Sequence, residues 1–76
     1  MSKEDKLLTI VSEVLELDRG KVHLDLSAEQ VESWDSLQQL NLISAVESTF
    51  GVTIPIEEVA SIGKVSDFLR YIEGAG

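Results

Sequence analysis

The segment whose residue types and spacing suggest chemistry is Trp34-Asp35-Ser36-Leu37, in which a serine stands at the predicted start of a helix. A serine hydroxyl can act as a nucleophile beside a general base, or it can carry a phosphate ester. The only histidine that could serve as a base is His23, and no G-x-S-x-G turn surrounds Ser36. A hydrolase nucleophile is therefore not expected at Ser36.

Two other roles for Ser36 stay open. The run Ser36-Leu37-Gln38-Gln39 matches the S-x-x-Q capping box, and Asp35 is also a good N-cap. In that case Ser36 does no more than begin a helix, as most serines at helix starts do. Alternatively, the free amides and the dipole of a helix N-terminus favour a phosphate group, so Ser36 could carry a phosphate ester there.

The rest of the sequence offers few residues for other kinds of site. The chain has no Cys and a single His, which argues against disulfides, thiolate metal sites and His-based zinc sites. Gly63-Lys64 is not part of a G-x-x-x-x-G-K-[ST] phosphate loop, and no loop has EF-hand spacing. Because no catalytic set of side chains is evident, the protein is predicted not to be an enzyme and to hold no metal.

Two long helices are predicted from apolar residues repeated at helical spacing. The first carries one apolar stripe over residues 7–15, has Ser2 as a weak cap, and is expected to end at Asp18-Arg19-Gly20. The second begins at Asp35 or Ser36 and runs to Phe50, with Gly51 just after its end. Its apolar residues cover more than one stripe, so it is the candidate central helix.

A short third helix is predicted after Pro55, ending by Gly63, and a last helix over residues 65–72. Residues 21–35 alternate in part like a strand, but residues 52–54 are the only candidate partner, and a lone strand pair is marginal. We therefore predict a long loop that packs its apolar residues onto the helices: Val22, Leu24, Leu26, Val31 and Trp34.

These elements predict an all-α fold, a small four-helix bundle with three long helices, one short helix and a long loop between the first two helices. The length of 76 residues suits one domain, residues 1–76. The start Met-Ser-Lys-Glu-Asp-Lys is followed by no long apolar run, so neither a signal peptide nor a membrane span is predicted. We expect a soluble, cytoplasmic monomer.

The chain is acidic, with 14 Asp and Glu against 6 Lys and Arg, a net charge of −8. No Lys or Arg occurs between Lys21 and Lys64, an interval that holds Asp25, Glu29, Glu32, Asp35, Glu47, Glu57 and Glu58. Such a surface repels nucleic acid and anionic membranes and would steer toward basic partners. An acidity that only keeps a small protein in solution explains the charge equally well.

The chain resembles the carrier-protein family, which comprises acyl carrier proteins and their aminoacyl or peptidyl relatives. The similarity rests on Trp34-Asp35-Ser36-Leu37, the helix that follows to Glu47-Ser-Thr-Phe50-Gly51, and Val-Thr-Ile54-Pro55. Acidic residues and a final helix ending in Tyr71-Ile72 follow. The resemblance covers essentially the whole chain, and it also implies a four-helix bundle with a short third helix.

The resemblance implies that Ser36 is the attachment site of phosphopantetheine, a covalent group derived from coenzyme A, with Asp35 and Leu37 as flanking recognition positions. The thiol of that group would carry acyl or aminoacyl units as thioesters, in fatty-acid-like, polyketide or specialised acyl-transfer biosynthesis. The implied partners are a phosphopantetheinyl transferase and the acyl- or aminoacyl-loading and synthase enzymes, with basic docking patches. The protein would transport intermediates and would not catalyse their reactions.

The sequence departs from the family pattern at two places. Fatty-acid carriers are acidic along the second helix, whereas Gln38, Gln39 and Asn41 stand here, which weakens the case for housekeeping fatty-acid partners. The Gly-Gly that precedes the serine in many peptidyl carriers is replaced by Ser33-Trp34, and Trp34 is expected to anchor the loop by burial.

Two further questions stay open in the sequence. Six apolar residues could part to admit an acyl chain between the second and third helices, although such residues are more often ordinary core: Leu42, Val46, Phe50, Ile54, Val59 and Ile62. The alternative function is an unmodified acidic interaction module with a carrier-like fold, in which Ser36 is only a cap. Binding that weakens with salt and ignores Ser36→Ala would favour that alternative.

Overall fold

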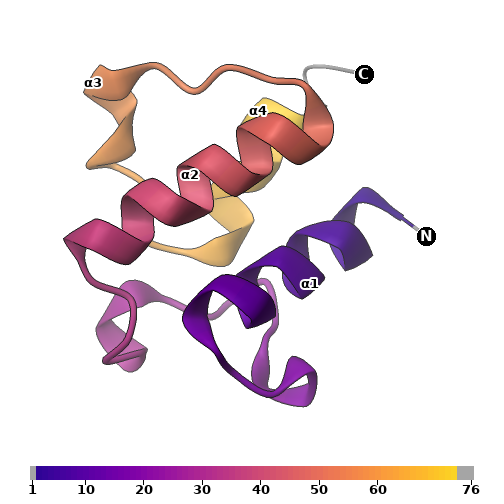
Figure 1. The fold of residues 1–76 in the computed structure, drawn as a ribbon, viewed down its shortest axis with the longest axis vertical. Helices are drawn as coiled ribbons and strands as arrows, with labels where there is room; N and C mark the ends of the chain where they lie inside the picture. The colour runs from indigo at the N-terminus through magenta and orange to yellow at the C-terminus, as the bar shows by residue number, and fades with distance from the viewer. Residues whose placement is uncertain (1, 74–76) are drawn as a thin grey trace.

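The first helix, α1, spans Lys3–Leu15 in the computed structural model, which describes residues 2–73 (Figure 1). The Ser2 side chain caps it by accepting a hydrogen bond from the Asp5 amide at 3.1 Å, as predicted. The helix ends earlier than expected, because Glu16 adopts a left-handed conformation with φ of 56°. Asp18-Arg19-Gly20 instead leads into a 3-10 turn, Arg19–Lys21.

The second helix, α2, spans Ser36–Phe50 and runs antiparallel to α1 at its side (Figure 1). Asp35 caps its start, and Gly51 closes it with φ of 66°, a conformation that glycine adopts without a steric penalty. Leu42 and Val46 have no exposed surface, which agrees with the prediction that α2 is the central helix.

The third and fourth helices are shorter. Pro55 precedes α3, Ile56–Val59, which lies near the N-terminal end of α2 (Figure 1). The last helical stretch covers residues 65–73 and begins as a 3-10 turn, Val65–Phe68, before it continues as α4, Leu69–Glu73. The predicted all-α bundle of four helices, with α3 the short one, is confirmed, and the part of the chain that is described contains no strand.

The long loop between α1 and α2 packs as predicted. It contains the turn Arg19–Lys21 and a second 3-10 turn, Ala28–Gln30, and its apolar side chains join the core. Its unexpected partner is the segment before α4. The Ala28 amide donates to the Gly63 carbonyl at 2.8 Å, and the Val65 amide donates to the Leu26 carbonyl at 3.0 Å. These bonds link the loop to the segment just before α4 and so fix the part of the loop that leads into α2.

The core lies where α1, α2, the loop and the last helical stretch meet. Leu7, Val11, Leu42, Val46, Val65 and Phe68 have no exposed surface. Trp34, with 6% of its surface exposed, anchors the end of the loop beside α2, as expected from the size of its side chain. Within residues 2–73, no helix is long and apolar enough to span a membrane.

Candidate functional site

Ser36 is the first residue of α2, and its side chain is exposed. Asp35, and not Ser36, caps this helix. The Asp35 carboxylate accepts a hydrogen bond from the Gln38 amide at 2.9 Å, and the Asp35 carbonyl accepts one from the Gln39 amide at 2.8 Å. Of the two caps that the sequence allowed, Asp35 is the one observed, and Ser36 and Gln39 form no capping box. In the described residues the Ser36 hydroxyl has no hydrogen-bond partner, so the helix start does not depend on it.

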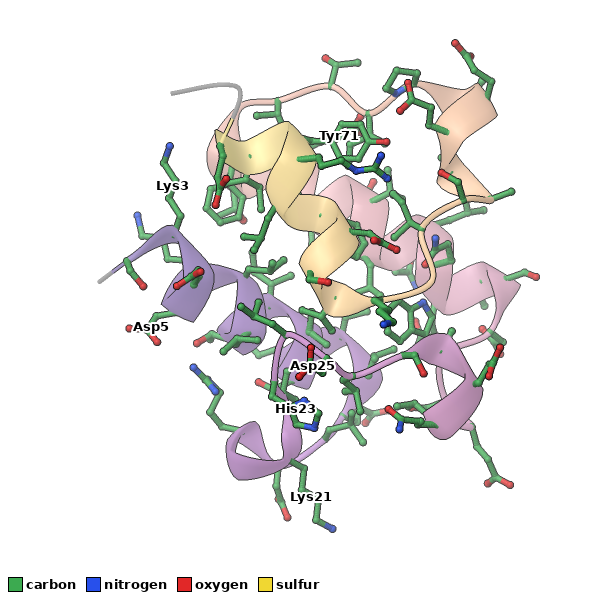
Figure 2. All side chains as sticks on the ribbon, turned by 180° about the vertical axis from the view of Figure 1, so that it is seen from behind. Lys3, Asp5, Lys21, His23, Asp25 and Tyr71 are labelled. Atoms are coloured by element: carbon green, nitrogen blue, oxygen red, sulfur yellow. The ribbon has the colours of Figure 1, made fainter. Side chains whose placement is uncertain are left out.

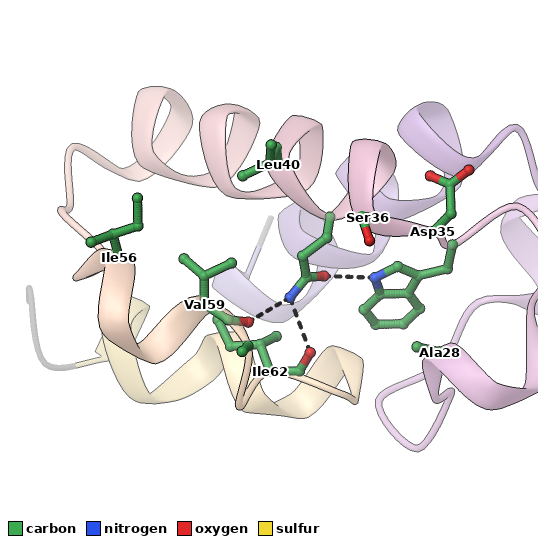
Figure 3. Close-up of a pocket in the computed structure, with 10 residues that line it drawn as sticks. Ala28, Asp35, Ser36, Leu40, Ile56, Val59 and Ile62 are labelled. Atoms are coloured by element: carbon green, nitrogen blue, oxygen red, sulfur yellow. Dashed lines mark hydrogen bonds between the residues drawn. The ribbon is translucent and has the colours of Figure 1, made fainter.

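An open pocket of about 640 Å³ lies beside Ser36, between α2 and α3 (Figure 3). It is lined mainly by apolar residues, and Asp35 is the one ionisable group in its lining: Ala28, Trp34, Asp35, Ser36, Gln39, Leu40, Ile56, Val59, Ala60 and Ile62. The Asp35 carboxylate caps α2, and the lining contains no His or Lys that could act as the base of a nucleophile–base pair with Ser36. The lining is suited to binding an apolar group.

The side chain of Gln39 joins three segments across this pocket. Its Oε1 accepts a hydrogen bond from the Trp34 Nε1 at 2.7 Å. Its Nε2 donates to the carbonyl of Val59 at 2.9 Å and to that of Ile62 at 3.0 Å (Figure 3). We call this set of three hydrogen bonds the Gln39 clamp. In the sequence, the position of Gln39 three residues after Ser36 suggested only a capping partner. No sequence signal indicated that Gln39 would join these three segments.

The predicted site residues Asp35, Ser36 and Leu37 come together at the N-terminal end of α2, and all three are exposed. Large apolar side chains stand exposed near them. Leu37 is 67% exposed, Leu40 is 56% exposed, and Ile56 on α3 is 82% exposed. Exposed apolar side chains grouped in this way are typical of a surface that contacts another molecule.

The exposed residues of α2 are uncharged, and apart from Leu37 and Leu40 they are polar. The one ionisable residue of α2 is Glu47, and the Glu47 carboxylate accepts a hydrogen bond from the Ile54 amide at 2.8 Å. Glu47 therefore helps to hold the segment after α2 in place. A side-chain hydrogen bond also links α4 to α3. The Tyr71 hydroxyl of α4 donates to the Glu58 carboxylate of α3 at 2.6 Å. That hydrogen bond, with smaller contributions from desolvation and the Glu58 charge, raises the pKa of Tyr71.

The six residues considered as a route for an acyl chain are mostly core. Leu42, Val46, Ile54 and Ile62 are buried, and Phe50 and Val59 pack against the core. Of the six, only Val59 and Ile62 reach the pocket.

His23 lies exposed on the long loop, as do Asp25 and Lys21, and does not line the pocket (Figure 2). Across residues 2–73 no group of acidic, His or Cys side chains is arranged to hold a metal ion.

Comparisons with known proteins show the family of the chain. Residues 5–72 match the family model described as "Phosphopantetheine attachment site". An acyl carrier protein of Prochlorococcus marinus (strain MIT 9515) is 36% identical over 76 residues, covering 96% of this chain and 95% of the relative. An acyl carrier protein of Helicobacter acinonychis (strain Sheeba) is 33% identical over 73 residues, covering 96% and 94%.

The residues at the start of α2 fit a covalent phosphopantetheine group. An exposed hydroxyl without a structural duty stands beside an open, mostly apolar pocket, at a helix terminus that favours phosphate. No catalytic set of side chains accompanies it. The chain therefore belongs to the acyl carrier protein family, whose members carry a covalent phosphopantetheine group and are carriers and not enzymes.

Proposed function

We propose that this protein is a discrete carrier that holds acyl or aminoacyl groups on a phosphopantetheine arm attached to the Ser36 hydroxyl. The observation that carries the proposal is the division of labour at the start of α2. Asp35 caps the helix, while the Ser36 hydroxyl is exposed and has no partner in the described structure. Esterification of that hydroxyl would therefore break no hydrogen bond of the fold.

The surroundings of Ser36 suit a phosphodiester. The amides of Ser36 and Leu37 have no acceptor among the described residues, whereas those of Gln38 and Gln39 are bonded to Asp35. Free amides and the helix dipole stabilise a negative charge at this position. Once attached, the group supplies a thiol that bonds the cargo as a thioester. The chain itself supplies the attachment point, the rigid helix start and the pocket along which the arm can lie.

The neighbours of Ser36 would serve recognition. Asp35 keeps the helix start in shape, and the exposed side chain of Leu37 offers an apolar contact to a phosphopantetheinyl transferase. Loading and synthase enzymes would meet the same end of α2. Because the exposed side of α2 is uncharged, long-range steering by basic patches contributes less here than apolar contact with Leu37, Leu40 and Ile56. This favours specialised acyl-transfer biosynthesis, whether fatty-acid-like or polyketide, over housekeeping fatty-acid synthesis.

The test is the intact mass of the protein after incubation with coenzyme A and a broad-specificity phosphopantetheinyl transferase. Ser36→Ala removes the proposed attachment site, and Ser44→Ala, at another exposed serine of the same helix, is the matched control. We expect a single phosphopantetheine addition on the wild type and on Ser44→Ala, and none on Ser36→Ala. Addition to Ser36→Ala would overturn the site assignment. No addition to the folded wild type, even with transferases from several carrier systems, would favour the unmodified interaction module.

A further inference from the structure

The Gln39 clamp engages both the oxygen and the nitrogen of one side-chain amide at a partly buried position. Its oxygen is taken by the Trp34 indole, and its nitrogen is shared between the Val59 and Ile62 carbonyls. Trp34 lies 25 and 28 residues before those carbonyls in the chain, so the clamp joins segments that no local structure holds together. It connects the loop before α2, the first turns of α2, the end of α3 and the segment that follows α3 (Figure 3).

The clamp lies at the inner wall of the pocket beside Ser36. Gln39, Trp34, Val59 and Ile62 all line that pocket. Behind it are core residues of α2 such as Leu42, which has no exposed surface. An apolar chain that passes deeper between α2 and α3 must separate the clamp. That step leaves the Trp34 indole N–H, the Gln39 side-chain amide and the Ile62 carbonyl without these partners at a partly buried position, which is unfavourable.

The wall that the clamp holds is otherwise weakly supported. The helix α3 has only four residues, Ile56–Val59, too few to be stable by itself. On its other side it is tied by the hydrogen bond from Tyr71 to Glu58. Side-chain hydrogen bonds from α2 and α4 therefore help to decide the distance between α3 and α2, and with it the depth of the pocket.

We propose that Gln39 is a positioning residue that fixes the floor of this pocket and so limits the cargo that the protein shelters to short acyl chains. This inference rests on the proposed attachment at Ser36. While the three hydrogen bonds of the clamp are formed, the phosphopantetheine arm and the first carbons of a cargo can lie in the pocket. The remainder of a longer acyl chain then stays in solvent. With the clamp removed, α3 can separate from α2 and the chain can extend toward the core.

The test is a chain-length series. A phosphopantetheinyl transferase loads the protein from acetyl-, butyryl-, hexanoyl-, octanoyl- and decanoyl-coenzyme A, and intact mass verifies each product. The rate at which hydroxylamine cleaves the thioester measures shelter. Each methylene that becomes buried can slow cleavage by up to about fourfold, the equilibrium factor for burying one CH₂. The wavelength of Trp34 emission gives a second readout, since Trp34 is the one tryptophan of the chain.

The variant Gln39→Met removes the clamp with an apolar side chain of similar length that suits a helix. The matched control is Gln38→Met. Gln38 precedes Gln39, and its side-chain amide donates to the Val14 carbonyl of α1 at 3.2 Å, away from the pocket. Both substitutions remove a partly buried side-chain bond to a carbonyl, but only Gln39→Met opens the wall beside α3.

In the wild type and in Gln38→Met, we expect the protection of the thioester from hydroxylamine to stop increasing among the shorter acyl chains of the series. In Gln39→Met this protection should continue to increase with chain length up to decanoyl. The unloaded Gln39→Met protein should also exchange its Trp34 indole hydrogen faster, because that N–H has lost its acceptor. If Gln39→Met does not fold, Gln39→Glu keeps an acceptor for the Trp34 indole but lacks the donor to the Val59 and Ile62 carbonyls, and it should shift the length limit in the same direction.

The inference is overturned if wild-type protection rises through the whole series, if Gln39→Met and the wild type give the same dependence on length, or if Gln38→Met shifts the limit equally. These results differ from a failure of the proposed function, in which no acyl-phosphopantetheine is added to Ser36 and the intact mass stays unchanged.

Discussion

The two roles considered for Ser36, helix cap and attachment site, can be distinguished by how substitutions at the start of α2 change the free energy of unfolding. In Asp35→Ala the Gln38 amide loses its acceptor, now 2.9 Å away. Loss of such a cap costs about 1 kcal/mol, within a range of about 0.5–2 kcal/mol. In Ser36→Ala no hydrogen bond of the described structure is lost, and the side chain is exposed. Exposed substitutions of this kind usually change stability by less than about 0.5 kcal/mol.

Urea or thermal unfolding followed by Trp34 fluorescence measures both changes, since Trp34 is 6% exposed and becomes solvated on unfolding. For a domain of this size, about 1 kcal/mol corresponds to a shift of roughly 4–8 °C in Tm. Asp35→Asn is the matched control. It keeps a capping oxygen and loses only the favourable interaction of the charge with the helix dipole, about 0.3–1 kcal/mol.

We expect Asp35→Ala to be clearly destabilised, Asp35→Asn to lie between it and the wild type, and Ser36→Ala to unfold like the wild type. The reasoning would be refuted if Ser36→Ala lost as much stability as Asp35→Ala, because Ser36 would then be a cap after all. The loss of phosphopantetheine from Ser36→Ala would in that case no longer separate a missing attachment site from a damaged helix start.

Two further predictions concern the backbone and the titration of the fold. Gly51→Ala should destabilise the protein by about 1–2 kcal/mol, because φ of 66° is unfavourable for alanine even though no neighbouring atom lies within 4 Å of the added carbon. Gly63 has no positive φ, so Gly63→Ala should show no such loss in the same unfolding assay. The raised pKa of Tyr71 means that its hydrogen bond to Glu58 contributes stability that is fully present below the pKa of a free tyrosine, about 10, and is lost as the pH rises through the raised value. Tyr71→Phe should therefore be less stable than the wild type at neutral pH, and the difference should shrink in strongly alkaline solution; a difference that stays constant with pH would contradict this.

Much of the fold followed from the sequence, because its signals are local. The apolar stripe of α1, the Ser2 cap and the bounds of α2 with Gly51 at its end depend on residues within a few positions of one another. The loop was also correctly predicted to pack its apolar residues, since burial is favourable whatever their backbone conformation. The early end of α1 at Glu16 was missed, because a left-handed glutamate is rare and has no sequence signature.

The sequence by itself determined which hydroxyl stands at a helix start, and the motif around Ser36 was sufficient to indicate the carrier family. Only the tertiary structure decided what the neighbours of Ser36 do. Local spacing allowed either Asp35 or Ser36 to cap α2 and suggested Gln39 as a capping partner. In the structure the Gln39 side chain is instead bonded to the carbonyls of Val59 and Ile62, which lie 20 and 23 residues beyond it. Packing brings these carbonyls to Gln39, so its role could not be predicted from periodicity or capping rules.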